Sequence, residues 1–475
     1  MNPPNNLLMY ALGTLLIIAG VLAVATLVHY SGSVPTLAFF HACFLLLLVL
    51  TFPRPRMYFY TFFAAFLFLG FWPKVVMQII WAVGFIEPVG DFSGSPAEWD
   101  NALQAAGWGA AGVMLARLIQ LALCRRQLTT CQDISLPAPA WFARHRRWIW
   151  PATLILIVAL NALNLQFAFF QIGVNPQLIL PMKLNVLIAW LINVGFAFWI
   201  AALVHWEFAL DQPSQGSALL APIAEAFFAS VCTLSRLTYL LHTAPYWVAI
   251  WEKWGSFRNL SSHRRRISLF STFCLLFAAS VYAVFWLRVN IYYYIPPEDS
   301  VATEVHRTMV FQLPNLFIQR WVGLEGTLVV SAVPTRNKEL LVEVLTSNPK
   351  LGTKSLYQQL AKVRYHSEDP GKFTFLANTG VVAILLFSGS LAVVFLGMAL
   401  VTALLMIVEI CMARLLANDF LQAVAGASLA NVIAQTTFPY LTLIFFLQMC
   451  VAIAFLAWLQ RARMPRLPLM SRTRT

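Results

Sequence analysis

Residues 391–413 read LAVVFLGMALVTALLMIVEICMA, an apolar run in which Glu409 is the one charged side chain. About 20 apolar residues cross the hydrocarbon core of a bilayer as a helix, because backbone polar groups in lipid must be satisfied within the segment. Comparable runs fill most of the chain, at about 7–29, 35–52, 57–86, 101–123, 148–171, 184–209, 267–289, 417–435 and 440–460. We therefore predict an all-α polytopic membrane protein with about 10–12 transmembrane helices.

The composition excludes an ordinary soluble protein. Of the 475 residues, 60% are hydrophobic and 11% are charged, whereas about a quarter of the residues of a soluble protein are charged. The net charge of +13 is typical of an excess of Lys and Arg in cytoplasmic loops, so nucleic acid is not an expected partner. The seven cysteines show no paired framework, and the N-terminal apolar run is too long for a cleaved signal and is predicted to be the first span.

The basic residues predict the orientation. One set of loops and the C-terminal tail holds 18 Lys and Arg, whereas the short loops near 30–34, 87–100, 172–181 and 436–439 hold none. The positive-inside rule then places both termini in the cytoplasm. For this count to hold, the interrupted run 219–250 enters and leaves on the cytoplasmic side, as a re-entrant pair, a surface helix or two tight spans.

A long polar insertion separates two blocks of membrane sequence. Residues 290–377 carry nine Lys/Arg and eight Asp/Glu and are predicted to face outward. The chain then divides into N-terminal spans (1–289), one large outer loop (290–377) and C-terminal spans with a cytoplasmic tail (378–475). Run 378–413 is too long for one helix, and we predict that it splits at 388–390 into a half-helix from Asn378 and a full span.

Ionisable residues within spans are costly in lipid and are functional candidates by default. Arg117 and Glu409 lie near the cytoplasmic ends of their runs, where snorkelling or pairing with a neighbouring helix explains them. For Lys74, Arg236 and Arg288, the same explanation and a functional role are both open. In the outer loop, Arg320 and Glu325 lie within an apolar stretch that we expect to pack on the membrane domain; the other titratable candidates there are Glu304, His306, Arg307, Lys362, Arg364 and His366.

Arginines at an outer membrane face favour a phosphate or pyrophosphate ligand, because the guanidinium is a planar fork of donors that matches phosphate oxygens. A carboxylate beside such a group can take a proton from an incoming hydroxyl. The sequence has no recognisable metal-ligand spacing and no Gly-rich phosphate loop, so we expect no metal and no cofactor.

Several short motifs resemble, in order, those of Wzy-type oligosaccharide repeat-unit polymerases from bacterial polysaccharide gene clusters. They are residues 69–74 (LGFWPK), 87–92 (EPVGDF), 235–236 (SR), 320–326 (RWVGLEG), 378–380 (NTG) and 388–390 (SGS). The resemblance extends over about residues 60–460. The chain departs from some O-antigen polymerases in lacking a doubled Arg-rich loop motif.

The resemblance implies a metal-independent membrane glycosyltransferase of the bacterial inner membrane, with the large loop in the periplasm. Its substrates would be oligosaccharide repeat units on undecaprenyl pyrophosphate, and a polysaccharide chain-length regulator is a candidate partner besides membrane lipids. Glu325 is implied to activate the acceptor hydroxyl and Arg320 to hold the pyrophosphate; the other implied substrate contacts are Arg288, Lys74, Arg236, Arg307, Glu87 and Trp321. The alternatives are a flippase or transporter, a glycan ligase, an acyltransferase using His41 or His205, and a structural or assembly protein.

Overall fold

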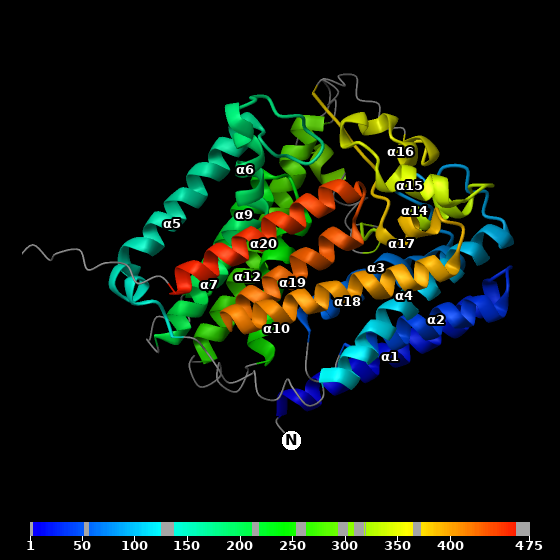
Figure 1. Cartoon of the computed structure of the whole chain (residues 1–475), viewed down its shortest axis with the longest axis horizontal. Helices are drawn as coiled ribbons and strands as arrows, with labels where there is room; N and C mark the ends of the chain where they lie inside the picture. Colours follow the sequence, from blue (N-terminus) through cyan, green and yellow to red (C-terminus); the bar gives the residue numbers. More distant parts are fainter. Residues whose placement is uncertain are drawn as a thin grey trace, which may run out of the picture.

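The protein is a bundle of helices, many of them long (Figure 1). The structure, a computed structural model, describes residues 3–51, 57–124, 137–210, 218–252, 263–292, 303–307, 318, 320–363 and 372–461. The described residues form helices and no β-strands. Two isolated β-bridges join Gln171 to Val174 and Val174 to Phe373. The predicted all-α polytopic fold is confirmed.

The described residues up to Tyr292 form ten α-helices. These are α1 (Pro3–His29), α2 (Val34–Val49), α3 (Tyr58–Trp81), α4 (Pro96–Cys124), α5 (Ala140–Phe167), α6 (Leu184–Trp190), α7 (Phe196–Ala209), α9 (Leu220–Cys232), α10 (Arg236–Glu252) and α12 (His263–Tyr292). A π-helical turn, Leu191–Gly195, joins α6 to α7. The second half forms α14 (Leu324–Ser331), α15 (Lys338–Leu345), α16 (Leu356–Leu360), α17 (Val381–Leu386), α18 (Leu391–Leu416), α19 (Asp419–Ala434) and α20 (Pro439–Arg461).

Eight of the described helical segments are long and apolar enough to cross a membrane, counting α6 and α7 with the turn between them as one. Three shorter apolar helices, α2, α9 and α19, pack among them. Residues 219–250 form the helical pair α9 and α10, joined by a tight turn at which Leu234 has a φ of +57°. Because α9 is buried on much of its surface, a surface helix is excluded for this segment.

The predicted break at 388–390 is confirmed. The half-helix α17 ends at Leu386, and α18 begins at Leu391. Gly389 between them has a φ of +73°, and a Cβ there would lie 2.6 Å from the carbonyl oxygen of Arg336. A glycine is therefore required both by the left-handed backbone and by the close approach of the outer loop. The half-helix begins at Val381, three residues after the predicted start.

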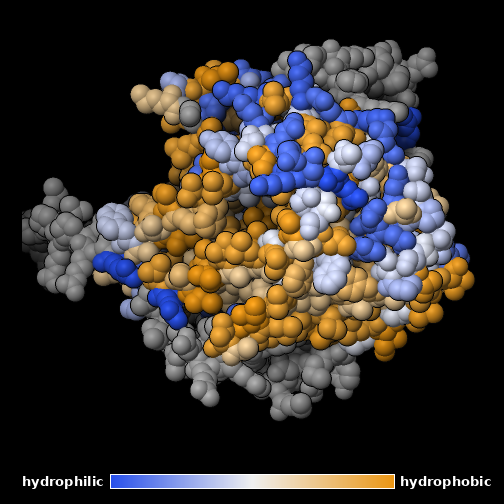
Figure 2. Space-filling model, turned by 45° about the vertical axis from the view of Figure 1, so that its right-hand side comes forward, coloured by the Kyte–Doolittle hydropathy of each residue, from blue (hydrophilic) through white to orange (hydrophobic). Residues whose placement is uncertain are grey.

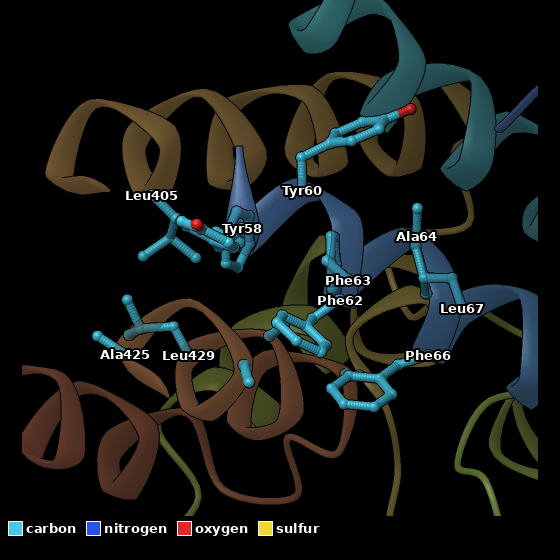
Figure 3. Packing of buried hydrophobic residues seen from close by; sticks show 14 of the residues in the cluster. Tyr58, Tyr60, Phe62, Phe63, Ala64, Phe66, Leu67, Leu405, Ala425 and Leu429 are labelled. Atoms are coloured by element: carbon cyan, nitrogen blue, oxygen red, sulfur yellow. The ribbon is translucent and has the colours of Figure 1, made fainter. Parts of the chain in front are cut away.

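The core is centred on α3 and α19. Figure 3 shows Phe62 of α3 beside Ala425 and Leu429 of α19, with Tyr58 of α3 next to Leu405 of α18. A Cβ at Gly426 would lie 2.7 Å from the backbone nitrogen of Phe59, so the glycine allows the two backbones to approach closely. Small residues at helix contacts are the usual means of association in membranes, where the surrounding lipid is as apolar as the helix surface.

Two of the charges predicted within spans have structural partners. The Glu409 carboxylate accepts hydrogen bonds from the backbone N–H groups of Tyr58 (2.6 Å) and Phe59 (2.9 Å), at the N-terminus of α3. An acid at this position satisfies helix donors that have no partner within the helix. Arg117 donates to the side chain of Gln120 at 2.5 Å, and its guanidinium lies 5.2 Å from the ring centre of Tyr60.

Loops that lack Lys and Arg gather at one end of the bundle. The Tyr30 hydroxyl donates to Asp100 at 2.8 Å, and the backbone N–H of Gly380 donates to the Thr436 carbonyl at 2.9 Å. The loop around residue 172 contacts the α9–α10 turn through a 3.0 Å backbone hydrogen bond from Ile172 to Thr233. Figure 2 shows hydrophilic residues gathered over a broad hydrophobic band. Segments predicted to share one side of the membrane therefore meet in pairs: the loop after α1 contacts Asp100, and the segment before α17 contacts Thr436.

Candidate functional site

The site is built around α14, a short helix of the outer loop that is buried along its whole length. It packs between α3, α4 and α17. Two glycines make this possible: a Cβ at Gly70 of α3 would lie 2.2 Å from the Val322 carbonyl oxygen, and one at Gly326 would lie 1.9 Å from the Thr379 carbonyl oxygen. The segments around residues 70, 323 and 379 therefore pack with their backbones in contact.

This packing brings Glu325 to Lys74. The Lys74 ammonium nitrogen lies 2.5 Å from each carboxylate oxygen, and the two side chains are 3% and 6% exposed. A buried charge is tolerated when it is paired and hydrogen-bonded. The two residues come from different predicted units of the chain, a span and the outer loop, so the ion pair ties the loop to the membrane domain.

Three more polar groups surround the pair. Glu87 and Arg320 are close enough to act on Lys74 electrostatically. The Tyr357 hydroxyl donates to the Asn378 carbonyl at 3.3 Å; burial, and then the charges of Glu325 and Glu87, raise the pKa of Tyr357 well above its ordinary value, so the phenol stays protonated. Burial also raises the pKa of the Glu325 carboxyl, although Lys74 acts in the opposite direction.

An open cleft of about 400 Å³ adjoins this cluster. It is lined by Phe85, Ile86, Glu87, Pro88, Val89, Gly90, Ala361 and Lys362. Its two walls are held together because Lys362 forms an ion pair with Asp91, and because Gly90 packs against the Leu360 carbonyl oxygen, from which a Cβ would be 2.2 Å away. Glu87 is half-buried and belongs both to the cleft and to the charges around Lys74.

Arg320 and Trp321 lie at the start of the same motif. Arg320 is exposed. Trp321 is half-buried and stacks on Phe66 of α3, with ring centres 5.4 Å apart. The stacked ring anchors the chain next to the exposed Arg320.

The structure separates two predicted substrate contacts from this cluster. Arg288 uses its Nε (3.0 Å) and Nη2 (2.7 Å) to donate to the Leu234 carbonyl oxygen, and the guanidinium of Arg236 lies 4.4 Å from the ring centre of Phe285. Both arginines therefore belong to the α9–α10 turn and α12, whereas the charges acting on Lys74 are those of Glu325, Glu87 and Arg320.

Of the remaining candidates in the outer loop, Glu304 is buried, whereas His306, Arg307 and Lys362 are exposed. Arg307 is exposed and forms an ion pair of 3.1 Å with Glu304. His306, beside it, is also exposed. Arg364 and His366 lie outside the described residues. Among the residues that the structure describes, no group of three or more His, Cys, Asp or Glu could hold a metal ion.

His41, a candidate catalytic residue of the alternative acyltransferase, has both ring nitrogens in hydrogen bonds within the core. The Thr26 hydroxyl donates to the Ala23 carbonyl at 2.7 Å, so the His41 Nε2–H must donate to Thr26 (2.7 Å). Trp72 Nε1–H, which can only donate, donates to His41 Nδ1 at 2.9 Å. His41 is thus a neutral, satisfied core residue, and its proton-accepting nitrogen is occupied, which counts against an acyltransferase built on it.

Sequence reasoning missed a second buried pair in the α9–α10 hairpin. His242 Nδ1 lies 3.0 Å from both carboxylate oxygens of Glu225, and its Nε2 lies 2.8 Å from the Asn193 carbonyl. Asn193 belongs to the π-helical turn, which directs this carbonyl to the imidazole. Tyr357 was also missed. The only available signal was the presence of ionisable residues in an apolar run.

Comparison of the chain with protein-family models, with curated proteins and with solved structures gives no match. The fold defines the class: a multi-pass, all-α membrane protein. Within that class it has a buried helix of the outer loop and a charged cluster beside an open cleft.

Proposed function

We propose that the chain is a membrane glycosyltransferase that polymerises oligosaccharide repeat units carried on undecaprenyl pyrophosphate. The observation that supports this best is Arg320, an exposed residue whose charge acts on Lys74 of the buried Lys74–Glu325 pair, together with the open cleft that Glu87 lines beside this pair. A guanidinium is permanently charged and planar, so at the edge of an apolar bundle it suits a ligand with a pyrophosphate head group and a lipid tail.

The reaction requires little from the protein beyond orientation and charge stabilisation. The acceptor sugar hydroxyl forms a bond to the anomeric carbon of the donor glycan, the bond from that carbon to pyrophosphate oxygen breaks, and lipid pyrophosphate leaves. Arg320 stabilises the charge that develops on the departing pyrophosphate. The hydroxyl proton passes to a carboxylate of the cluster, with Trp321 and the cleft walls positioning the glycan.

The location follows from the same proposal. The loops without Lys and Arg face the periplasm, so the cleft opens on the outer face of the bacterial inner membrane, with both termini in the cytoplasm. Arg288 and Arg236, at the same loop-rich end but apart from the cluster, are proposed contacts for a part of the lipid-linked substrate outside the cleft. A chain-length regulator remains a candidate partner.

The test is the length distribution of surface polysaccharide in a strain that lacks this chain. We expect the deletion strain to carry single repeat units on the final acceptor, and wild type to restore the ladder. Arg320→Ala should fail to restore it, whereas the matched control Lys338→Ala, an exposed cation of the same loop, should succeed. Loss of even the single-unit form in the deletion strain would instead indicate export by a flippase, or ligation.

A further inference from the structure

The cluster contains two carboxylates, and they differ in access. Both oxygens of Glu325 accept from Lys74 at 2.5 Å, and the side chain is 6% exposed. A general base must come within hydrogen-bond reach of the proton that it removes. Glu325 faces Lys74 inside the bundle, and a sugar hydroxyl could reach it only after this ion pair had broken.

Glu87 lies where a substrate can reach it. It forms part of the wall of the 400 Å³ cleft, a volume within the range of about 300–1,000 Å³ common for small-molecule sites. The cleft also has apolar and aromatic walls, Phe85 and Val89 among them, which suits the apolar faces of sugar rings. The Glu87 carboxylate acts on Lys74, Glu325 and Tyr357 electrostatically, so it lies at the junction between cleft and cluster.

We propose that Glu87 is the catalytic base of the transfer and that Glu325, through Lys74, is a positioning residue. This inference rests on the proposed polymerase function. The acceptor hydroxyl enters the cleft, its oxygen bonds to the anomeric carbon as the pyrophosphate leaves, and its proton moves to a Glu87 oxygen. The Lys74–Glu325 pair keeps α3, which precedes Glu87, in fixed register with the motif that carries Arg320.

The surroundings of Glu87 support this division of roles. Among the residues that the structure describes, the charged and titratable groups around it include Lys74 of α3, Glu325 of α14, Tyr357 of α16, and Asp91 and Lys362 at the cleft rim. Lys74 is held by Glu325, and Lys362 by Asp91, which fixes the groups on both sides of Glu87. The left-handed Gly90 (φ +63°), packed against Leu360, fixes the loop that carries it.

The experiment measures kcat and KM against pH for the full-length protein in lipid nanodiscs, supplied with lipid-linked repeat units. The variants are Glu87→Gln, Glu87→Asp and Glu325→Gln, with Glu343→Gln, an exposed acid of α15, as the control. We expect Glu87→Gln to lower kcat about 100- to 10,000-fold with KM nearly unchanged, and to remove the acid limb of the pH profile. Glu87→Asp should recover part of kcat and retain that limb.

Glu325→Gln should behave differently. It should lower the amount of folded protein and raise KM, while the activity that remains keeps the wild-type acid limb. The inference is overturned if Glu87→Gln stays within threefold of wild type, or if Glu325→Gln is the variant that loses the acid limb. Wild-type protein that makes no polymer from lipid-linked units would overturn the proposed function itself, a result distinct from either of these.

Discussion

The Lys74 ammonium lies 2.5 Å from both carboxylate oxygens of Glu325, although the two residues are 251 positions apart in the chain. One belongs to a membrane span and the other to the outer loop, and both are buried. The pair therefore decides where the loop meets the membrane domain. It also places the motif of Arg320 and the loop of Glu87 around the same point.

The first prediction concerns the energy of this pair. Lys74→Met alone, or Glu325→Met alone, leaves an uncompensated buried charge and should cost about 3–5 kcal/mol. The double variant removes both charges and should recover most of that loss, because an apolar pair of similar volume needs no desolvation. Thermal unfolding in detergent measures this. Additive effects of the two single changes would show that the residues do not interact.

The second prediction concerns the glycine contacts of α14. Gly326→Ala would put a Cβ 1.9 Å from the Thr379 carbonyl oxygen, and a backbone atom cannot move aside as a flexible side chain can. The cost should reach or exceed the upper end of the usual overpacking range of about 1–3 kcal/mol. Gly20→Ala is the control, because no atom lies within 4 Å of a Cβ there. Folded yield and melting temperature are the measurements; equal values for both variants would argue against the packing of α14 described above.

A third prediction separates structural from functional acids. Glu409 accepts two backbone hydrogen bonds at the start of α3, and an amide can accept only one while presenting its NH₂ group to the other donor. Glu409→Gln should therefore lower stability by about 1–3 kcal/mol, measured by thermal unfolding. The protein that folds should keep the wild-type polysaccharide chain-length distribution. A shorter ladder at equal protein level would assign Glu409 a role beyond capping.

The sequence predicts the spans because lipid imposes one strong rule on them. The run at 391–413 became α18, and the break at 388–390 lies where predicted, since Ser and Gly interrupt an apolar segment too long for one helix. The structure of residues 219–250 was harder to predict, because a buried hairpin of two short helices gives no distinct periodic pattern of apolar residues. Its direction changes at Leu234, a residue without any turn signature.

The site could be predicted only in part. The rule that charges within spans are functional candidates singled out Lys74, and the apolar context singled out Glu325. The sequence could not show that Lys74 and Glu325 form a pair, since it gives no distance between residues 251 positions apart. The same rule on charges within spans also grouped Arg236 and Arg288 with Lys74, whereas these two arginines contact Phe285 and Leu234. Tyr357 was missed because a tyrosine in a polar loop has no distinguishing pattern.

The last prediction tests how the outer loop closes the cleft. Asp91 and Lys362 form an exposed ion pair at the rim, and such pairs contribute about 0.2–1 kcal/mol. Asp91→Lys or Lys362→Asp alone should therefore leave the melting temperature nearly unchanged. Each should nevertheless speed hydrogen exchange in residues 356–363, and raise KM for lipid-linked units about twofold to fivefold. The double charge swap restores an attractive pair, so it should return both values toward wild type. If the double variant is instead as impaired as the two single changes combined, the pair does not hold the cleft walls together, and Gly90 against Leu360 is the contact that does.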